Sequence, residues 1–276
     1  MRSFRIGFQG ESGSYSETSA SIEFPGPNYS FVPFKSFREL FDGVENSVVD
    51  LAVVPVENST EGSVNETYDL LVEKPLFVIG EIYQRIHHCL IINKNSSPEN
   101  ISIVYSHPQA LAQCRRYLQS KSLDSIPMYD TAGSVKFIKE SMNISAAAIA
   151  SKRAAQIYDM KILDENIEDN SNNFTRFFII SKTYENKADH DKISIIFSIS
   201  HTPGSLYSIL KEFASRKINL TKIESRPTKN VPWEYYFFVD LEGNTNDRRI
   251  SDSISSVENI VKFFKLLGSY KKAEIK

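Results

Sequence analysis

The sequence predicts an α/β protein made of two domains or three. Its 276 residues exceed the ~100–200 residues of one domain. The first two thirds alternate short runs of β-branched or aromatic residues with helix-like stretches, which is typical of a mainly parallel sheet. The last third follows the order β-α-β-β-α-β, which is typical of a smaller sheet covered by helices.

Strands of the first part are expected wherever β-branched or aromatic residues cluster between polar stretches. They cover residues 4–8, 30–34, 51–54, 76–93, 101–105, 146–150 and 174–181. Stretches between them, such as SFRELFDGVENS and TAGSVKFIKESM, place apolar residues at helical intervals. Several of these stretches open with Ser, Thr or Pro, which favour helix starts.

The polar stretch KTYENKADHDK has no apolar face to bury and is interpreted as a linker. We expect domains at residues 1–182 and 193–276, joined by residues 183–192. The second domain opens with the strand KISIIFSIS and a helix that starts at Pro-Gly. The strands INLTKIESRP and WEYYFFVDLEG follow, then a helix with Ile250, Ile254 and Val257 on one face, and the strand VKFFKLLGSY. This order is the ferredoxin-like arrangement.

Charge and cysteine content exclude several classes of protein. Lys plus Arg (32) nearly balance Asp plus Glu (34), so no basic excess favours nucleic acid or an anionic membrane as partner. No apolar run approaches the ~20 residues of a membrane span, and the N-terminus turns polar early, so a cytoplasmic protein is expected. Cys89 and Cys114 lack CxxC spacing, which favours buried free thiols. No metal-ligand spacing is present.

Three glycines, Gly7, Gly10 and Gly13, lie between the first strand and the first helix. Their spacing is not G-x-G-x-x-G, and Lys35 stands where an acidic residue should bind a ribose, so a nicotinamide dinucleotide is excluded. Two interpretations remain: a helix N-terminus that binds an anion, and a tight turn alone.

The run VPVENSTEG at residues 54–62 follows a buried strand, at the sheet edge where open α/β sheets bind ligands. Its residues Asn58, Ser59 and Thr60 could instead cap a helix that begins near Ser63, and spacing alone slightly favours that cap. Two carboxylates four residues apart, those of Glu57 and Glu61, keep the functional interpretation open.

The run SHPQ at residues 106–109 opens a helix after another strand. Adjacent residues rarely face each other and no GxSxG is present, so Ser106 is expected to cap the helix and not to act as a nucleophile. His87 and His88 should point to opposite faces of a strand, one buried and one exposed.

In the strand at residues 174–181, Thr175 and Phe177 share one face, and Arg176 shares the other with Phe174 and Phe178. An arginine among aromatic residues needs an anionic partner, which could be a substrate or an edge-strand carboxylate.

Taken together, these runs resemble the prephenate dehydratase family, from about Arg5 to Tyr270. The resemblance lies in the turn 10–17, VPVENSTEG, SHPQALAQC, DTAGS at 130–134, AAIAS at 147–151 and NFTRF at 173–177. The second domain resembles the ACT regulatory module, with HTPGSLY at 201–207 and INLTKIESRP at 218–227. No helical segment precedes the first strand, so a monofunctional enzyme without a fused chorismate mutase domain is expected.

The resemblance implies two lobes like those of periplasmic binding proteins, with substrate in the cleft. The chain would cross after about Tyr83 and return near Ile162. It also implies decarboxylating dehydration of prephenate to phenylpyruvate, without cofactor or metal, under feedback inhibition by phenylalanine. Arogenate as substrate and a non-catalytic small-molecule sensor are the alternatives.

The resemblance also implies roles for single residues. Thr175 would hydrogen-bond the leaving hydroxyl, with Arg176 as a carboxylate partner and Glu57 as a buried carboxyl whose pKa burial could raise. Neutral substrate-orienting donors would be Asn58, Ser59, Ser106, Gln113 and Thr131. Phenylalanine would bind in a homodimer or homotetramer at Gly204, Ser205, Leu206, Asn219, Leu220, Glu224, Ser225 and Arg226. Ser205 and Tyr207 stand where the family commonly has Ala and Val, which gives weight to the alternative that the module serves only dimerisation.

Overall fold

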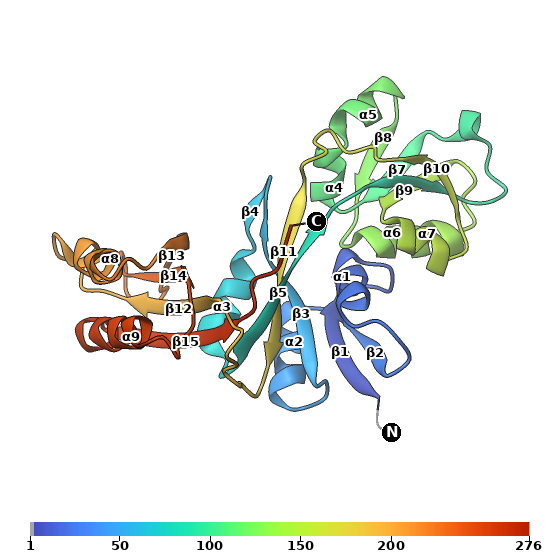
Figure 1. Cartoon of the computed structure of the whole chain (residues 1–276). Helices are drawn as coiled ribbons and strands as arrows, with labels where there is room; N and C mark the ends of the chain where they lie inside the picture. Colours follow the sequence, from blue (N-terminus) through green and yellow to red (C-terminus); the bar gives the residue numbers. More distant parts are fainter. Residues whose placement is uncertain (1–2, 276) are drawn as a thin grey trace. The chain divides into compact units, whose positions relative to one another are not determined.

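The computed structural model describes residues 3–275 and divides the chain into two compact units (Figure 1). Of the described residues, unit 1 contains those up to Thr67, Ile82–Phe177 and Ile275, and unit 2 contains Tyr68–Glu81 and Phe178–Glu274. Within the described residues, every helix is too short or too polar to cross a membrane.

The first lobe is built on a sheet of order β2-β1-β3-β11-β5, in which β4 pairs with β3; parts of β5, β11 and α3 belong to unit 2. Its strands are β1 Phe4–Gln9, β2 Tyr29–Phe34, β3 Leu51–Asn58, β4 Gly62–Ser63, β5 Phe77–Arg85 and β11 Phe174–Ser181. Its helices are α1 Tyr15–Glu23, α2 Phe37–Glu45 and α3 Asn65–Glu73. Strands β1, β2 and β3 run parallel, so their carboxyl ends meet at one edge of the sheet.

The second lobe is built on a sheet of order β10-β6-β9-β7-β8. Its strands are β6 Cys89–Ile92, β7 Ile103–Ser106, β8 Asp124–Pro127, β9 Ala146–Ala150 and β10 Lys161–Glu165. Its helices are α4 Pro108–Gln113, α5 Arg115–Ser120, α6 Thr131–Glu140 and α7 Lys152–Ile157, with a 3₁₀ turn at Pro98–Asn100. The central strand β9 is buried on both faces, with Ala148 in one apolar cluster and Ile149 in the other.

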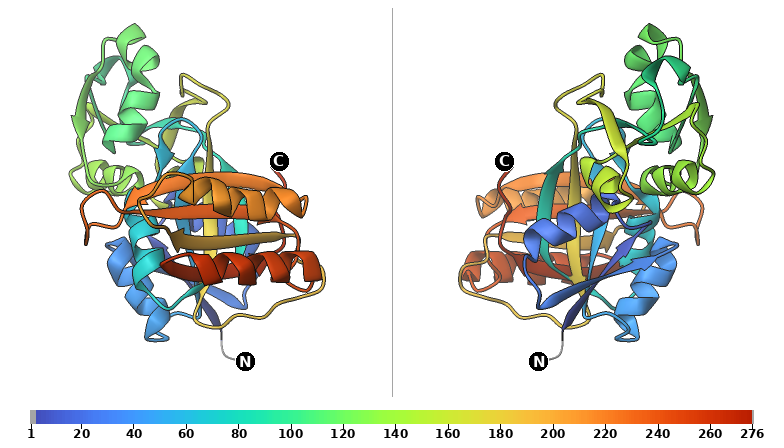
Figure 2. Two further views of the ribbon diagram at one scale, coloured as in Figure 1. Left: turned by 90° about the vertical axis from the view of Figure 1, so that its left-hand side faces the viewer. Right: turned by 90° about the vertical axis from the view of Figure 1, so that its right-hand side faces the viewer.

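Unit 2 contains an antiparallel sheet of order β13-β14-β12-β15. Its elements are β12 Lys192–Ser198, α8 Ser205–Ser215, β13 Leu220–Pro227, β14 Tyr235–Glu242, α9 Arg248–Ile260 and β15 Phe263–Tyr270. Both helices cover the same face of the sheet, as the left view of Figure 2 shows. This confirms the expected β-α-β-β-α-β order.

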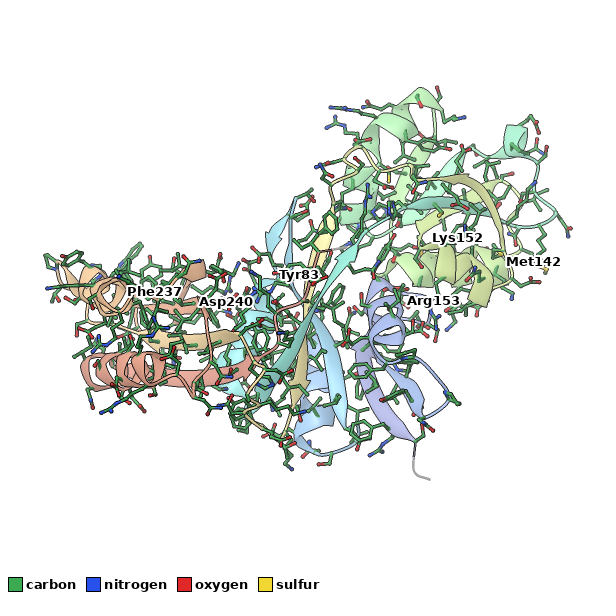
Figure 3. The ribbon with its side chains drawn as sticks, in the orientation of Figure 1. Tyr83, Met142, Lys152, Arg153, Phe237 and Asp240 are labelled. Carbon is green, nitrogen blue, oxygen red and sulfur yellow. The ribbon has the colours of Figure 1, made fainter. Side chains whose placement is uncertain are left out.

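The two faces of β14 have different partners within unit 2. Phe237 stacks on Phe197 on the helix-covered face, whereas Asp240 accepts a hydrogen bond from Ser194 on the opposite face; Phe237 and Asp240 are labelled in Figure 3. That second face also contacts residues 68–81, where the Tyr68 and Phe238 rings lie 4.6 Å apart.

Lys192 and Glu81 form an ion pair in unit 2, with Nζ 3.0 and 2.8 Å from the two carboxylate oxygens. Both side chains are buried, so each charge depends on the other for its stabilisation.

The structure differs from the sequence expectations at four places. The expected strand at 76–93 is two strands, β5 and β6, which belong to different sheets and are separated by residues 86–88. Strand β4, which has only two residues, is not among the predicted strands, and neither are β8 and β10. Strands β8 and β10 each lie at an edge of their sheet and are largely exposed or half-exposed, so their sequences lack a continuous apolar run.

Candidate functional site

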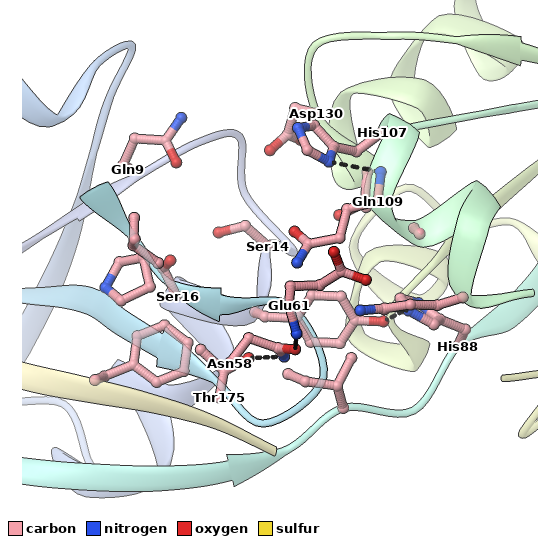
Figure 4. Close-up of a pocket in the computed structure, with 18 of the residues that line it drawn as sticks. Gln9, Ser14, Ser16, Asn58, Glu61, His88, His107, Gln109, Asp130 and Thr175 are labelled. Carbon is pink, nitrogen blue, oxygen red and sulfur yellow. Dashed lines mark hydrogen bonds between the residues drawn. The ribbon is translucent and has the colours of Figure 1, made fainter. Parts of the chain in front are cut away.

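Unit 1 holds a cavity of about 450 Å³ whose walls come from both lobes (Figure 4). Polar walls are formed by residues near strand ends and helix starts, among them Ser14, Asn58, His107 and Thr175. Apolar walls include Pro55, Ile86 and Phe177. The cavity thus combines an apolar surface for a ring with polar groups for its substituents.

Three helices begin at this cavity, and each is capped by a side chain. Ser14 Oγ accepts from the Glu17 N–H at the start of α1, and Asp130 Oδ1 accepts from the Gly133 N–H at 2.6 Å at the start of α6. His107 Nδ1 accepts from the Gln109 N–H at the start of α4. Helix N-termini carry partial positive charge, so their convergence favours an anionic ligand.

Three titratable side chains that line the cavity, those of His88, His107 and Asp130, have pKa values shifted mainly by burial. Burial raises the pKa of Asp130, a shift that the nearby Glu11 carboxylate increases and the Gly133 N–H opposes. Burial lowers the pKa of both His88 and His107, so both imidazoles are neutral at pH 7. Among the described residues that line the cavity there is no Lys or Arg.

Asn58 connects the turn after β3 to Thr175 on β11. Its Oδ1 accepts from the backbone N–H groups of Thr60 and Glu61, each at 3.0 Å, which fixes the orientation of the amide. Its Nδ2 donates to Asn173 Oδ1 at 2.8 Å and to Thr175 Oγ1 at 3.0 Å. Because Thr175 Oγ1 accepts this bond, the threonine keeps its own proton for donation to another group (Figure 4).

Two further predicted residues line the same cavity. Gln113 Oε1 accepts from Asn173 Nδ2 at 3.1 Å, and Thr131 is the first residue of α6. The structure therefore brings Asn58, Gln113, Thr131 and Thr175 to one cavity.

Unit 2 has a cavity of its own, also of about 450 Å³, at the loop before α8. Gly204, Ser205 and Leu206 line it, together with aromatic residues such as Trp233 and Tyr235. Gly204 has φ +85°, a conformation that favours glycine.

The sequence matches the family model described as prephenate dehydratase over residues 6–185, which is more than half of the chain. This chain belongs to the prephenate dehydratase family. A second model, the ACT domain, matches residues 193–259.

Known members of the prephenate dehydratase family resemble the chain over nearly its whole length. The prephenate dehydratase of Methanocaldococcus jannaschii is 43% identical over 94% of this chain and 94% of its own length. "Arogenate dehydratase/prephenate dehydratase 1, chloroplastic" of Arabidopsis thaliana is 39% identical over 96% of this chain and 71% of its own length.

Solved structures agree with this assignment of the fold. The prephenate dehydratase of Arthrobacter aurescens in complex with L-Phe has a TM-score of 0.89 and 30% identity over 97% of this chain and 90% of its own. A structure titled as a novel type of quorum quenching acylase, GqqA, has the same TM-score at 29% identity, over 98% of both chains.

Four residues that the sequence analysis predicts for the site do not line the cavity of unit 1. Glu57 and Arg176 alternate with Asn58 and Thr175 along their strands and so point to the opposite face. Ser59 Oγ donates to Asn172 O and accepts from the Phe174 N–H. Ser106 is fully buried and its Oγ donates to Ile149 O at 2.6 Å. Ser59 and Ser106 thus bind backbone and hold strands together.

Both expected helix caps are wrong. Asn58–Thr60 form the turn between β3 and β4, because Asn58 Oδ1 is satisfied within that turn, and α3 begins later, at Asn65. His107 caps α4 in place of Ser106.

The expectation of free, buried thiols is confirmed, and one of the two histidines is buried and the other exposed, but neither lies in a strand: they stand between β5 and β6. His88 is buried, whereas the His87 side chain is 42% exposed and its Nδ1 lies 2.8 Å from Glu168 Oε1. Cys89 and Cys114 are both free and buried.

The predicted effector residues do not all gather at the cavity of unit 2. Asn219, Leu220, Glu224, Ser225 and Arg226 do not line it. Asn219 Nδ2 instead donates to Glu242 Oε2 at 2.9 Å. The structure therefore separates the Gly204 turn from β13.

Sequence reasoning gave no site role to several residues that line the cavity of unit 1, notably Tyr15, His88, Gln109, Tyr129 and Asp130. Two adjacent histidines inside an apolar run were the signal for His88. For Asp130, the signal was its position directly before the predicted Thr131, in the run DTAGS that carries the family resemblance.

Proposed function

We propose that this protein is a prephenate dehydratase that is inhibited by phenylalanine. It converts prephenate and a proton into phenylpyruvate, carbon dioxide and water. One observation carries the proposal: Thr175 Oγ1 accepts from Asn58 and can donate only elsewhere, in a cavity with an apolar wall.

Thr175 is proposed to donate its hydroxyl proton in a hydrogen bond to the ring hydroxyl of prephenate. The ring carboxylate leaves as carbon dioxide, the electrons of its C–C bond shift into the ring, and the ring C–O bond breaks as the ring becomes aromatic. The departing hydroxide takes up the proton that the overall reaction consumes and leaves as water. A hydrogen bond to the departing oxygen stabilises the negative charge that develops there. Asn58 holds the threonine hydroxyl in place and is itself held by backbone N–H groups.

The helix starts at Ser14, His107 and Thr131 are proposed to bind the two carboxylates of prephenate. The backbone N–H groups at these helix starts carry a partial positive charge and no full charge. A cation fixed on the ring carboxylate would stabilise the substrate more than the decarboxylating transition state. The lack of Lys and Arg among the described lining residues agrees with this requirement.

Arogenate is the second candidate substrate. It carries an ammonium group where prephenate carries a keto group. The carboxyl groups of Glu61 and Asp130 line the cavity and could bind that ammonium. Relatives named arogenate dehydratase support this alternative.

Purified protein incubated with prephenate or arogenate tests the proposal, with phenylpyruvate absorbance and chromatography of phenylalanine as readouts. Thr175→Val serves as a control for contaminating activity, because valine keeps the volume and removes the hydroxyl. Turnover of neither substrate would favour the sensor alternative.

Residues 193–276 are proposed as the regulatory domain, joined by residues 183–192 to a catalytic domain at 1–182. We propose that phenylalanine binds near Gly204 and that β13 of another subunit completes its site in a homodimer or homotetramer. We also propose that the protein is cytoplasmic. The ACT match and the unit 2 cavity support the effector site. Calorimetry with phenylalanine and light scattering test the site and the oligomer. A monomer that binds no phenylalanine at millimolar concentration would contradict both.

A further inference from the structure

His88 lies at the end of a chain of five hydrogen-bonded side chains that leads to Thr175. Its Nε2 is 2.9 Å from Gln113 Oε1, and Gln113 Oε1 is 3.1 Å from Asn173 Nδ2. Asn173 Oδ1 is 2.8 Å from Asn58 Nδ2, which also donates to Thr175. His88 is 2% exposed, so its ring is largely shielded from water.

The donors and acceptors of this chain are determined from its Asn58 end. Backbone N–H groups face Asn58 Oδ1, so the Asn58 amide must present its Nδ2 to Asn173. Asn173 then accepts through Oδ1 and can only donate to Gln113, which therefore presents Oε1.

Gln113 Oε1 faces His88, so His88 Nε2 must carry a proton. In a neutral imidazole Nδ1 is then an acceptor, and the Tyr15 hydroxyl lies 2.8 Å from it. The same hydroxyl lies 2.7 Å from His87 O, which gives Tyr15 a second acceptor for its single proton.

We infer that His88, as its Nε2–H tautomer, is a positioning residue for Thr175: it fixes the Gln113 amide and, through Asn173 and Asn58, the direction in which the threonine hydroxyl donates. The catalytic consequence rests on the proposed function, whereas the tautomer does not.

The first test reads the tautomer by ¹⁵N–¹H NMR of the imidazoles at pH 7.5, in the full-length wild-type protein. We expect a protonated Nε2 and an unprotonated Nδ1 for His88, assigned with a His88→Gln sample. An Nδ1–H tautomer in the wild type would overturn the inference. This readout needs no substrate, so it stands even if neither prephenate nor arogenate is turned over.

Asn173→Asp tests whether the donors and acceptors at residue 173 determine the tautomer of the His88 imidazole. A carboxylate cannot donate to Gln113, so the Gln113 amide should turn its Nε2 toward residue 173 and His88. His88 should then shift to the Nδ1–H form, with Tyr15 donating to His87 O. Asn172→Asp is the matched control, because it adds the same charge at the neighbouring exposed residue. An unchanged tautomer in a folded Asn173→Asp protein would contradict the coupling.

Two substitutions of His88 separate hydrogen bonding from packing. Glutamine places an N–H near the Nε2 position and can still donate to Gln113, whereas asparagine reaches only the Nδ1 position. We expect His88→Gln to keep kcat within about threefold and His88→Asn to lose roughly tenfold in kcat with little change in KM, as for one lost hydrogen bond. Equal kcat in both variants, with matching melting temperatures, would reject the positioning role.

Discussion

Arg226 and Asp69 form a two-point ion pair in unit 2, with Nε 3.1 Å from Oδ1 and Nη2 3.3 Å from Oδ2. Lys229 Nζ is 2.6 Å from the same carboxylate. Burial alone would raise the pKa of Asp69, but hydrogen bonds from Lys229 and Arg226 lower it. The pair attaches β13 to α3, and the residues just before α3, Gly62–Val64, line the cavity of unit 1.

We predict that Asp69→Asn weakens inhibition by phenylalanine. Loss of the carboxylate removes the contacts of α3 with Arg226 on β13 and with Lys229 just after that strand, so a change in β13 is transmitted less strongly to the cavity. The concentration of phenylalanine for half-inhibition should rise about three- to tenfold, which corresponds to a coupling of ~1 kcal/mol. Uninhibited kcat should stay within about twofold.

The matched control is Asp252→Asn, which removes an exposed carboxylate from the Arg248 pair on α9. An Asp69→Asn protein with wild-type inhibition would show that the pair is only structural.

Thr175→Val should lower kcat by roughly 10²-fold or more, because it removes one donor to the developing charge and keeps the volume. Thr175→Ser keeps the hydroxyl and the bond from Asn58, so most of the activity should remain. Steady-state kinetics and thermal melts of both variants check this. Similar kcat values for the two would rule out a role for the hydroxyl.

Arg176→Leu should destabilise the protein without raising KM. Arg176 is 4% exposed and lies on the strand face opposite Thr175, so we expect it to support the fold and not to bind the substrate. Leucine cannot replace the interactions of this buried arginine, and their loss costs about 1–3 kcal/mol of unfolding free energy. Urea unfolding together with KM separates the two roles, and a raised KM at unchanged stability would contradict this placement.

Gly13→Ala should destabilise the first helix start and reduce activity. Gly13 has φ +93°, and a Cβ there would lie 2.7 Å from the Ala154 Cα on α7. Relief of that clash must move the start of α1, which lines the cavity through Ser14. Gly26→Ala is the control, because Gly26 has a similar φ of +106° and nothing within 4 Å of its Cβ position. Equal melting temperatures of the two variants would exclude the clash as a cause.

Acid should destabilise the protein partly through His88. Burial lowers its pKa below 6.5, so the unfolded chain binds more protons than the folded one as pH falls below that value. Its contribution to stability is complete above pH 6.5 and is lost as pH falls through the folded pKa.

Urea unfolding at pH 7.5, 6.5 and 5.5 should therefore show a smaller loss of unfolding free energy in His88→Gln than in wild type. His107, whose pKa burial also lowers, titrates in both proteins and does not affect the difference. Parallel curves for the two proteins would contradict the shift of His88.

Most strands could be predicted because their patterns are local. The alternation of Thr175, Arg176 and Phe177 correctly assigned their faces from sequence, since side chains alternate along any strand. Which face meets a cavity depends on what packs against the sheet, and Arg176 and Glu57 could not be placed for that reason. Edge strands β8 and β10 escaped prediction because they bury too little apolar surface to show a pattern.

The sequence by itself determined the α/β class, the β-α-β-β-α-β order, the free thiols and the resemblance to the family, since each is expressed in short runs along the chain. Only the tertiary structure decided which polar groups meet. Asn58 and Thr175 are 117 residues apart, and His88 and Gln113 are 25 apart. Their contacts follow from the order of strands in two sheets. Local propensity acts over a few residues and carries no information about that order, so the hydrogen-bonded chain from His88 to Thr175 is visible only in the fold.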